Sequence, residues 1–232
     1  MSEQRQLIDP GPAAPRADRR RELDAYLSPS RATAALLDRT PELRGLDLLL
    51  DPSCGDGRMA AQIARSGAFR TVHLNDVHEG RLAQARDALR QVEAVGPRAS
   101  MHDAAHPALY VVAPCATITN PPWNAAGAIV HQALRRTRRL VAMLLRVTWL
   151  DDCGASHRAP RGDRHWLVQV PPTRMIVVGR ISYSGDGATD SAPSAWFLWL
   201  REGPGQPWQR GGIEVVSHDD GAQLGLGVDD AP

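Results

Sequence analysis

The chain has 232 residues, of which 43% are hydrophobic and 23% charged, values typical of a globular domain with one sizeable core. Its formal net charge of +1 lacks the strong basic character common in nucleic-acid-binding domains, so composition neither supports nor excludes such a partner. The chain has no apolar run near the roughly 18 residues of a membrane span, no secretory signal and no metal-ligand spacing among its three cysteines, which predicts a cytoplasmic protein without membrane partner or metal.

Both ends of the chain differ in composition from its centre. Residues 1–21 are rich in Pro, Ala, Arg and Asp without hydrophobic periodicity, and residues 217–232 are rich in Gly and Asp. Such segments bury too little apolar surface to fold alone, so we expect two disordered tails. The predicted folded domain spans residues 22–216.

Short apolar runs alternate with segments of helical periodicity through most of this domain. Buried strands that alternate with helices of ten or more residues are typical of an open, mainly parallel α/β sheet. The expected strands and helices are, in order, 46–50, 58–67, 71–77, 78–96, 115–119, 126–139 and 140–150.

The last third of the chain has a different pattern. Two apolar runs, 175–181 and 194–200, have no helix between them and are joined by a turn-rich segment, 182–193. This arrangement predicts an antiparallel hairpin, so that the parallel sheet ends in a reversed edge strand. The Arg- and His-rich segment 151–166 has little periodicity and is expected to form a loop over one face.

A glycine-rich turn, DPSCGDG, lies where the first strand meets the first helix. Gly55 and Gly57 allow the backbone to approach a ligand closely and to direct free N–H groups at it. With Ala60, the same glycines also fit the loose dinucleotide-binding pattern, and Asp76 follows about 20 residues later. An NAD-dependent oxidoreductase and a tight turn without any ligand therefore stay open as alternatives.

Two further acids are candidates for cofactor contacts. Asp76 ends the second strand, where a carboxylate can accept hydrogen bonds from both ribose hydroxyls of an adenosine-containing cofactor, and Asn75 lies beside it. Asp103 follows a weakly indicated third strand and could accept from an adenine amino group. Alternatively, Asp76 caps the next helix and Asp103 belongs to a solvated loop.

The sequence Asn120-Pro121-Pro122-Trp123 follows the fourth strand, at the same sheet edge as the glycine turn. The lone pair of an exocyclic amine is conjugated with its ring, and two acceptors that pull on the amine hydrogens make it more available. The Asn120 side-chain oxygen and the Pro121 carbonyl can be these acceptors, since consecutive prolines hold them rigidly. Trp123 offers a stacking face to a base. The alternative is an ordinary loop breaker.

The chain resembles the class I S-adenosylmethionine-dependent methyltransferases that methylate amino nitrogens, and in particular small phage and prophage DNA adenine-N6 methyltransferases. DPSCGDG is similar to the cofactor loop of that family, NPPW to its catalytic motif, and the segment from Tyr26 to Pro29 to the piece that covers the methionine end. The resemblance extends over about residues 26–200. The cofactor residues that it implies are Tyr26, Ser28, Pro29, Asp51, Pro52, Ser53, Cys54, Gly55, Gly57, Asp76, Asp103 and Asn120.

The resemblance implies a Rossmann-like, mostly parallel seven-stranded sheet with one antiparallel strand and helices on both faces. It also implies S-adenosyl-L-methionine as the cofactor, DNA as the substrate and direct in-line methyl transfer to adenine N6. Trp123 stands where Tyr or Phe is commoner, and no large target-recognition domain follows. Target reading would then depend on two loops and would be short or relaxed. The candidate nucleic-acid contacts are Arg158, Arg161, Arg164 and Tyr183.

The same four-residue motif suits any planar amine. A base in RNA and a glutamine side chain in a protein are therefore alternative acceptors, and a cofactor-binding module without catalysis is a further alternative. Nothing in the sequence indicates the oligomeric state, the target site or the strandedness of the substrate.

Overall fold

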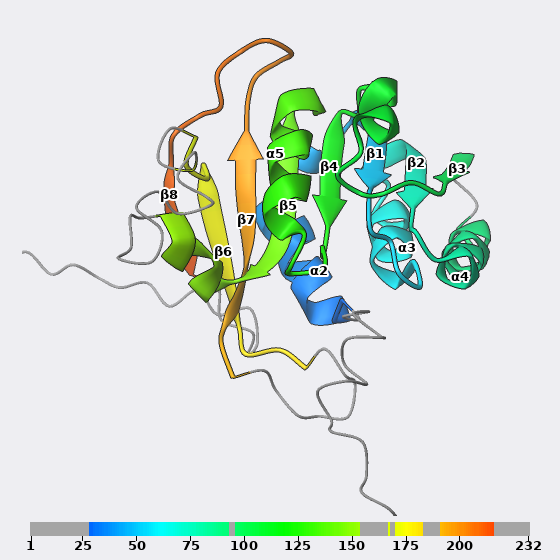
Figure 1. The fold of residues 1–232 in the computed structure, drawn as a ribbon, viewed down its shortest axis with the longest axis horizontal. Helices are drawn as coiled ribbons and strands as arrows, with labels where there is room; N and C mark the ends of the chain where they lie inside the picture. The colour runs from blue at the N-terminus through cyan, green and yellow to red at the C-terminus, as the bar shows by residue number, and fades with distance from the viewer. Residues whose placement is uncertain (1–27, 93–95, 154–166, 168–169, 183–190, 216–232) are drawn as a thin grey trace, which may run out of the picture.

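A computed structural model describes residues 28–92, 96–153, 167, 170–182 and 191–215 of the chain (Figure 1). They form one eight-stranded sheet with helices on both faces. The strands are β1 (Leu46–Asp51), β2 (Phe69–Asn75), β3 (Gly96–Ser100), β4 (Ala116–Thr119), β5 (Leu140–Arg146), β6 (Arg174–Gly179), β7 (Ser194–Leu200) and β8 (Gly212–Val215). The helices are α2 (Ser30–Arg39), α3 (Arg58–Arg65), α4 (Glu79–Arg90) and α5 (Ala126–Arg136), with short 3-10 turns η1 (Pro41–Leu43), η2 (Pro107–Val112) and η3 (Val147–Cys153).

The order of strands in the sheet is β3-β2-β1-β4-β5-β7-β6-β8. Every neighbouring pair is parallel except the two that β7 makes, with β5 and with β6. In the middle of β1, Leu49 pairs with Val72 of β2 on one side and with Ala116 of β4 on the other. From β1 the chain adds β2 and β3 on one side, and it then adds β4 and the later strands on the other side. In open α/β folds, ligands bind at the carboxyl ends of the strands where the order switches in this way.

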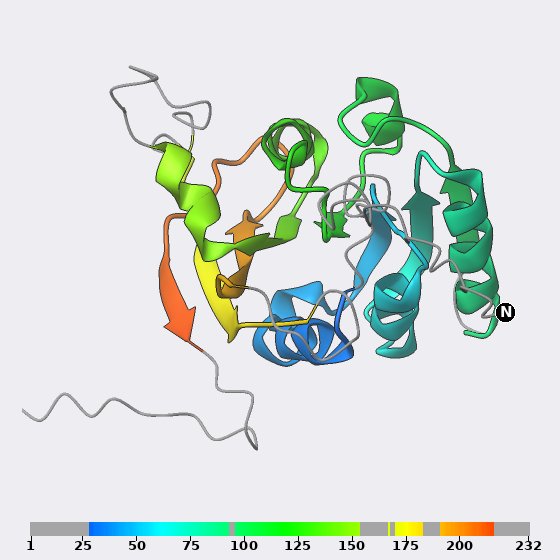
Figure 2. The ribbon, with the colours of Figure 1, turned by 60° about the horizontal axis from the view of Figure 1, so that its bottom comes forward.

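The sheet separates two hydrophobic cores. One core packs beneath α2, α3 and α4, and the other packs beneath α5 and η2. Side chains alternate between them along each strand: in β5, Leu144 belongs to the first core and Leu145 to the second. Figure 2 shows α5 on one side of the sheet and α2 and α3 on the other.

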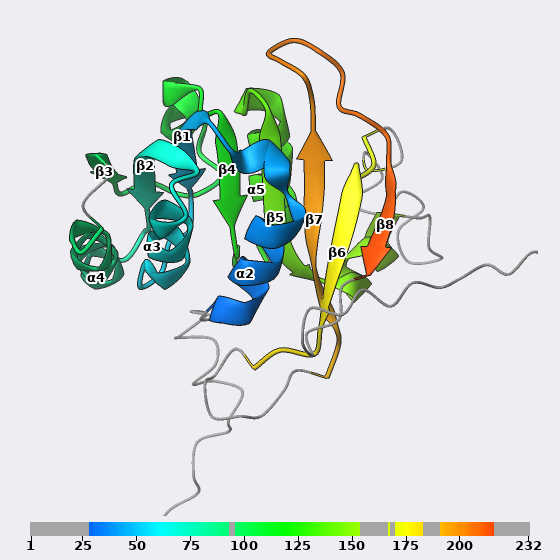
Figure 3. The ribbon, with the colours of Figure 1, turned by 180° about the vertical axis from the view of Figure 1, so that it is seen from behind.

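All seven residues of strand β7 are buried. Figure 3 shows α2 lying across this part of the sheet, opposite α5. The fully buried Trp196 of β7 donates a hydrogen bond of 2.7 Å from its Nε1 to the carbonyl of Ala32 in α2. Helix α2 is thus attached to a strand that lies 164 residues later in the chain.

The predicted fold class is confirmed, and three details differ from expectation. The reversed strand is not at the edge: β7 lies between β5 and β6, since an apolar run buried on both faces has to sit inside the sheet. The sheet has an eighth strand, β8, which was not expected from the sequence and pairs in parallel with β6. The strand expected over 140–150 ends at Arg146, where η3 begins.

No helix in the described ranges combines the length and the apolar character needed to cross a lipid bilayer.

Candidate active site

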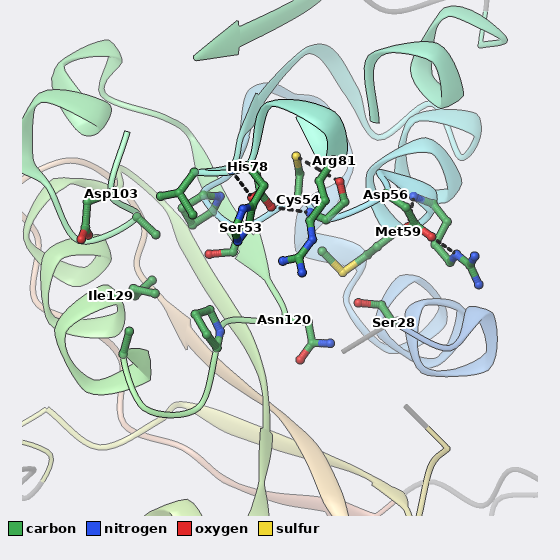
Figure 4. A pocket seen from close by; sticks show the side chains of 18 of the residues that line it. Ser28, Ser53, Cys54, Asp56, Met59, His78, Arg81, Asp103, Asn120 and Ile129 are labelled. Atoms are coloured by element: carbon green, nitrogen blue, oxygen red, sulfur yellow. Dashed lines mark hydrogen bonds and ion pairs between the residues drawn. The ribbon is translucent and has the colours of Figure 1, made fainter. Parts of the chain in front are cut away.

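A cavity of about 360 Å³ opens at the carboxyl ends of β1, β2 and β4 (Figure 4). Its walls come from five segments far apart in the sequence: Ser28 before α2, the loop after β1, the residues after β2, the residues after β3, and the motif after β4. Figure 4 shows Asp103 and Ser28 on opposite sides of this cavity, with Asn120 toward the Ser28 side. The strand order brings together the segments that follow β1, β2, β3 and β4, and the packing of α2 adds Ser28.

The glycine turn is held by backbone geometry. Gly55 and Gly57 have φ angles of +56° and +78°, in the left-handed region that favours glycine. A Cβ on Gly57 would lie 2.4 Å from the Cα of Ala85, because the turn passes directly against α4. The N–H of Cys54 donates to the carbonyl of Asn75 at 2.9 Å. The turn is therefore fixed to the end of β2 before any ligand arrives.

Asp76 is one of the acids that line the cavity. Only 6% exposed, it lines the cavity and accepts hydrogen bonds from the backbone N–H groups of Gly55 at 3.0 Å and His78 at 2.9 Å. A carboxylate has about four acceptor positions, so about two stay available to a ligand. Asp76 does not cap the next helix, because the N-cap of α4 is His78 and has no side-chain capping bond; the Asp76 carboxylate instead holds the glycine turn.

Asn75, by contrast, is fully buried and committed to the protein. Its amide donates to the carbonyls of Pro52 and His102, and its oxygen accepts from the Ser100 hydroxyl and the His102 N–H, each at 2.9 Å. These four bonds use all of the donors of the side chain and fix the ends of β1, β2 and β3 relative to one another. Asn75 is therefore a structural residue and not a second candidate for a ribose contact.

The far side of the cavity is partly apolar. Asp103 lines it from the loop after β3, with Oδ1 accepting from the N–H of Ala105 at 2.7 Å. Next to it, the cavity is lined by Val77, which is 57% exposed, and by Ile129 of α5. Sequence analysis missed these two residues. The position of Val77 directly after Asp76 could have indicated that it lines the cofactor site. Ile129 carries no such signal, because it has the ordinary periodicity of a buried helix residue.

The motif after β4 divides between the cavity and the core. Asn120, 8% exposed, lines the cavity together with Pro122, and Pro121 is buried. Trp123 does not line this cavity: it is half-buried and packs against the core on the α2 side. The guanidinium carbon of Arg146, the last residue of β5, lies 3.5 Å from the centre of the Trp123 ring. Sequence analysis gave no role to Arg146.

Two buried titratable groups lie beneath the turn. Burial, and to a smaller extent the nearby Asp76 carboxylate, raises the pKa of Asp51 to about 7, although the Ser53 N–H donates to this carboxyl at 3.3 Å. Burial likewise raises the pKa of the Cys54 thiol, and both aspartates raise it further. Cys54 stays a protonated packing residue, whereas Asp51 changes its charge near neutral pH.

The other residues predicted from the sequence are divided between the cavity and segments that the structure does not describe. Ser28, Pro52 and Ser53 line the cavity, while Pro29 precedes α2 and its carbonyl accepts from the N–H of Ala32. The residues outside the described ranges are Tyr26, Arg158, Arg161, Arg164 and Tyr183. Within the described part of the chain, no group of three or more His, Cys, Asp or Glu side chains could hold a metal ion.

No protein-family model and no curated protein matches the chain. Solved structures of methyltransferases do match it. TrmN from Thermus thermophilus is 22% identical with a TM-score of 0.53, over 78% of this chain and 52% of that one. A dimethyladenosine transferase from Plasmodium falciparum is 10% identical with a TM-score of 0.53, over 75% and 62%. A precorrin-6y C5,15-methyltransferase from Geobacter metallireducens is 10% identical with a TM-score of 0.51, over 76% and 90%.

At these identities the similarity defines the fold alone. The fold is the Rossmann-like fold of the class I, S-adenosylmethionine-dependent methyltransferases. Proteins with this fold are named for substrates as different as an adenosine and a precorrin. The acceptor therefore has to be inferred from the residues of this chain.

Proposed function

We propose that this chain transfers the methyl group of S-adenosylmethionine to the N6 amino group of adenine in DNA. One observation carries the proposal: Asn120, the first residue of the NPPW motif, lines the same cavity as the glycine turn and Asp76. An amine-polarising side chain and an adenosine-type cofactor site thus share one space.

The cavity residues suit the parts of S-adenosylmethionine. Asp76 has free acceptor positions for the ribose hydroxyls, and Asp103 can accept from the adenine amino group, with Val77 and Ile129 as apolar walls. The polar Ser28 side would take the methionine end. The volume of about 360 Å³ is within the range of small-molecule sites. The cofactor supplies a methyl group that its sulfonium makes electrophilic.

The chain's own residues prepare the acceptor nitrogen. The Asn120 side-chain oxygen and the Pro121 carbonyl accept hydrogen bonds from the two amine hydrogens, which frees the lone pair. The nitrogen–carbon bond then forms as the carbon–sulfur bond breaks, leaving S-adenosylhomocysteine, and the surplus proton passes to solvent. In duplex DNA the adenine must leave the base stack to reach this position.

RNA adenine is the second candidate acceptor. The Plasmodium falciparum structure is named a dimethyladenosine transferase, and adenosine is a ribonucleoside, so this fold accommodates such chemistry. DNA stands first because the motifs and the small size of the chain resemble phage and prophage DNA adenine methyltransferases.

We further propose that Arg158, Arg161 and Arg164 contact the nucleic-acid backbone. Tyr183 is a further proposed contact to the nucleic acid, and Tyr26 is proposed to belong to the cofactor site. Replacing the three arginines by alanine should weaken binding to unrelated duplexes alike. Each lost phosphate contact should flatten the log–log salt dependence by about 0.9. An unchanged slope of the log–log salt dependence would show that these three arginines do not contact DNA phosphates.

Two measurements test the central proposal. Calorimetry should detect binding of S-adenosylmethionine and none of NADH, and the reverse result would favour the oxidoreductase alternative. Transfer of labelled methyl groups should then be measured to DNA, RNA and a glutamine-containing peptide. Label on N6-methyladenine in DNA, absent with the Asn120→Ala protein, is the expected result, and label in RNA or peptide alone would reassign the acceptor. Expression in a methylation-deficient bacterium, followed by modification-sensitive sequencing, would report the target context.

A further inference from the structure

The Trp123 ring is half-buried and contacts other parts of the protein. One contact is with the hydrophobic core on the α2 side, and another is with Arg146, whose guanidinium carbon lies 3.5 Å from the ring centre. Trp123 is also absent from the lining of the cavity that holds Asn120. The ring face that Arg146 covers is therefore not open to a base.

Strand geometry explains how Arg146 reaches the ring. Side chains alternate along β5, so Arg146 projects to the same face as Leu144, which belongs to the core that Trp123 packs against. As the last residue of β5, it lies at the carboxyl edge, where it pairs with Ser194 of β7. A partly exposed cation thus stands beside the catalytic motif at the edge where the cavity opens.

A separation of 3.5 Å is full stacking contact, so no base fits between the guanidinium and the ring. Base and guanidinium compete for the same surface of Trp123. A stacked base contacts an indole more strongly than a partly exposed cation does, so the exchange favours the base. The displaced guanidinium is planar, always charged and suited to bidentate phosphate contacts.

We infer that Arg146 is an acceptor-positioning residue that covers Trp123 until the target base displaces it, and that then binds the phosphate beside the extruded nucleotide. This inference rests on the proposed function. It also predicts that the site prefers a nucleotide base over a glutamine side chain. A nucleotide carries a phosphate that can bind the guanidinium after it leaves the ring, whereas a glutamine side chain carries none.

The test compares Arg146→Ala and Arg146→Lys with Arg139→Ala. Arg139 directly precedes β5, so it lies at the opposite end of the same strand; it is exposed, and its removal changes the net charge equally. Methyl transfer to an adenine-containing duplex is measured over a salt series, after thermal melting has shown that each variant is folded.

For Arg146→Ala we expect KM for the duplex to rise about tenfold or more, as for the loss of one charge-assisted phosphate contact. We expect kcat to change by less than about threefold, since transfer itself is untouched, and the log–log salt slope to fall by about 0.9. Arg146→Lys should keep the slope, and Arg139→Ala should match the wild type in all three quantities.

Each other outcome rejects the inference in a recognisable way. If Arg146→Ala matches Arg139→Ala, Arg146 has no part in acceptor binding. If kcat falls while the salt slope stays constant, Arg146 only supports the packing of Trp123. If the wild-type protein binds S-adenosylmethionine but methylates no nucleic acid, the proposed function fails and the inference fails with it.

Discussion

Asp76 holds Gly55 directly, through a hydrogen bond of 3.0 Å from the glycine N–H to the carboxylate. The acid after β2 and the turn after β1 therefore form one wall of the cavity. In the proposed function this carboxylate acts twice, because it shapes the turn and also receives the ribose.

Asp76→Ala should weaken S-adenosylmethionine binding at least tenfold, since a hydrogen bond to a charged group contributes about 1.5–3 kcal/mol. Calorimetry measures the affinity, and urea unfolding measures the accompanying loss of turn stability. The matched control is Asp87→Ala, which removes an exposed acid of α4 that forms an ion pair with Arg90. This variant should bind S-adenosylmethionine as the wild type does. Unchanged affinity in Asp76→Ala would place the ribose elsewhere, although not on Asn75, whose amide is fully engaged.

Asn120→Ala should reduce methyl transfer by about 10²–10³ and leave cofactor affinity nearly unchanged, because its side chain acts on the amine in the transition state. Single-turnover rates and calorimetry on the same preparation separate the two effects. Gln91→Ala, which removes an exposed amide at the end of α4, should be indistinguishable from wild type. A parallel loss of cofactor affinity in Asn120→Ala would assign Asn120 to the cofactor instead.

Asp51→Asn should change how stability depends on pH. Because the pKa of Asp51 rises from its ordinary 3.8 to about 7 on folding, the folded state holds the proton more tightly. The stability that this group contributes is therefore lost as pH rises from about 4 to about 7, with a slope of at most about 1.4 kcal/mol per pH unit. Urea unfolding from pH 4 to 8 should show the variant gaining stability over wild type across this window. Parallel pH profiles would mean that Asp51 is ionised throughout.

Gly57→Ala should be strongly destabilising. Its φ of +78° and the 2.4 Å approach to Ala85 combine left-handed strain with overpacking, which together cost about 3 kcal/mol or more. Gly80→Ala is the matched substitution, since Gly80 lies in α4 with nothing within 4 Å of an added Cβ. It should be neutral or stabilising by up to about 1 kcal/mol. Equal midpoints in urea unfolding would show that α4 can move away from the turn.

Local patterns predicted the location of Asp76 and Asn120 better than they predicted the order of the strands. Asp76 and Asn120 each follow a short apolar run, and parallel strands bring such ends to one edge, so both were identified correctly as neighbours of the glycine turn. The place of β7 in the sheet depends on which strands pair with it, and those strands are distant in the sequence. The residues of β7 indicate only that the strand is completely buried. The sequence analysis could not foresee that Arg146 covers Trp123, because the contact joins the end of β5 to a motif more than 20 residues earlier.

The hydrogen bond from Trp196 to Ala32 joins two segments that are synthesised at different times. Helix α2, which follows Ser28 of the cavity, is made early during synthesis, yet its docking partner on β7 emerges from the ribosome only after some 160 further residues. The half of the cavity built from β1, β2 and the glycine turn can form before then from neighbouring segments. The attachment of α2 to β7 comes later, so a nascent or truncated chain that stops before Trp196 would carry the turn and the NPPW motif. In that chain α2 could still contact α3 through the hydrogen bond from the Gln62 amide to the Ser30 carbonyl, but it would lack its bond to β7.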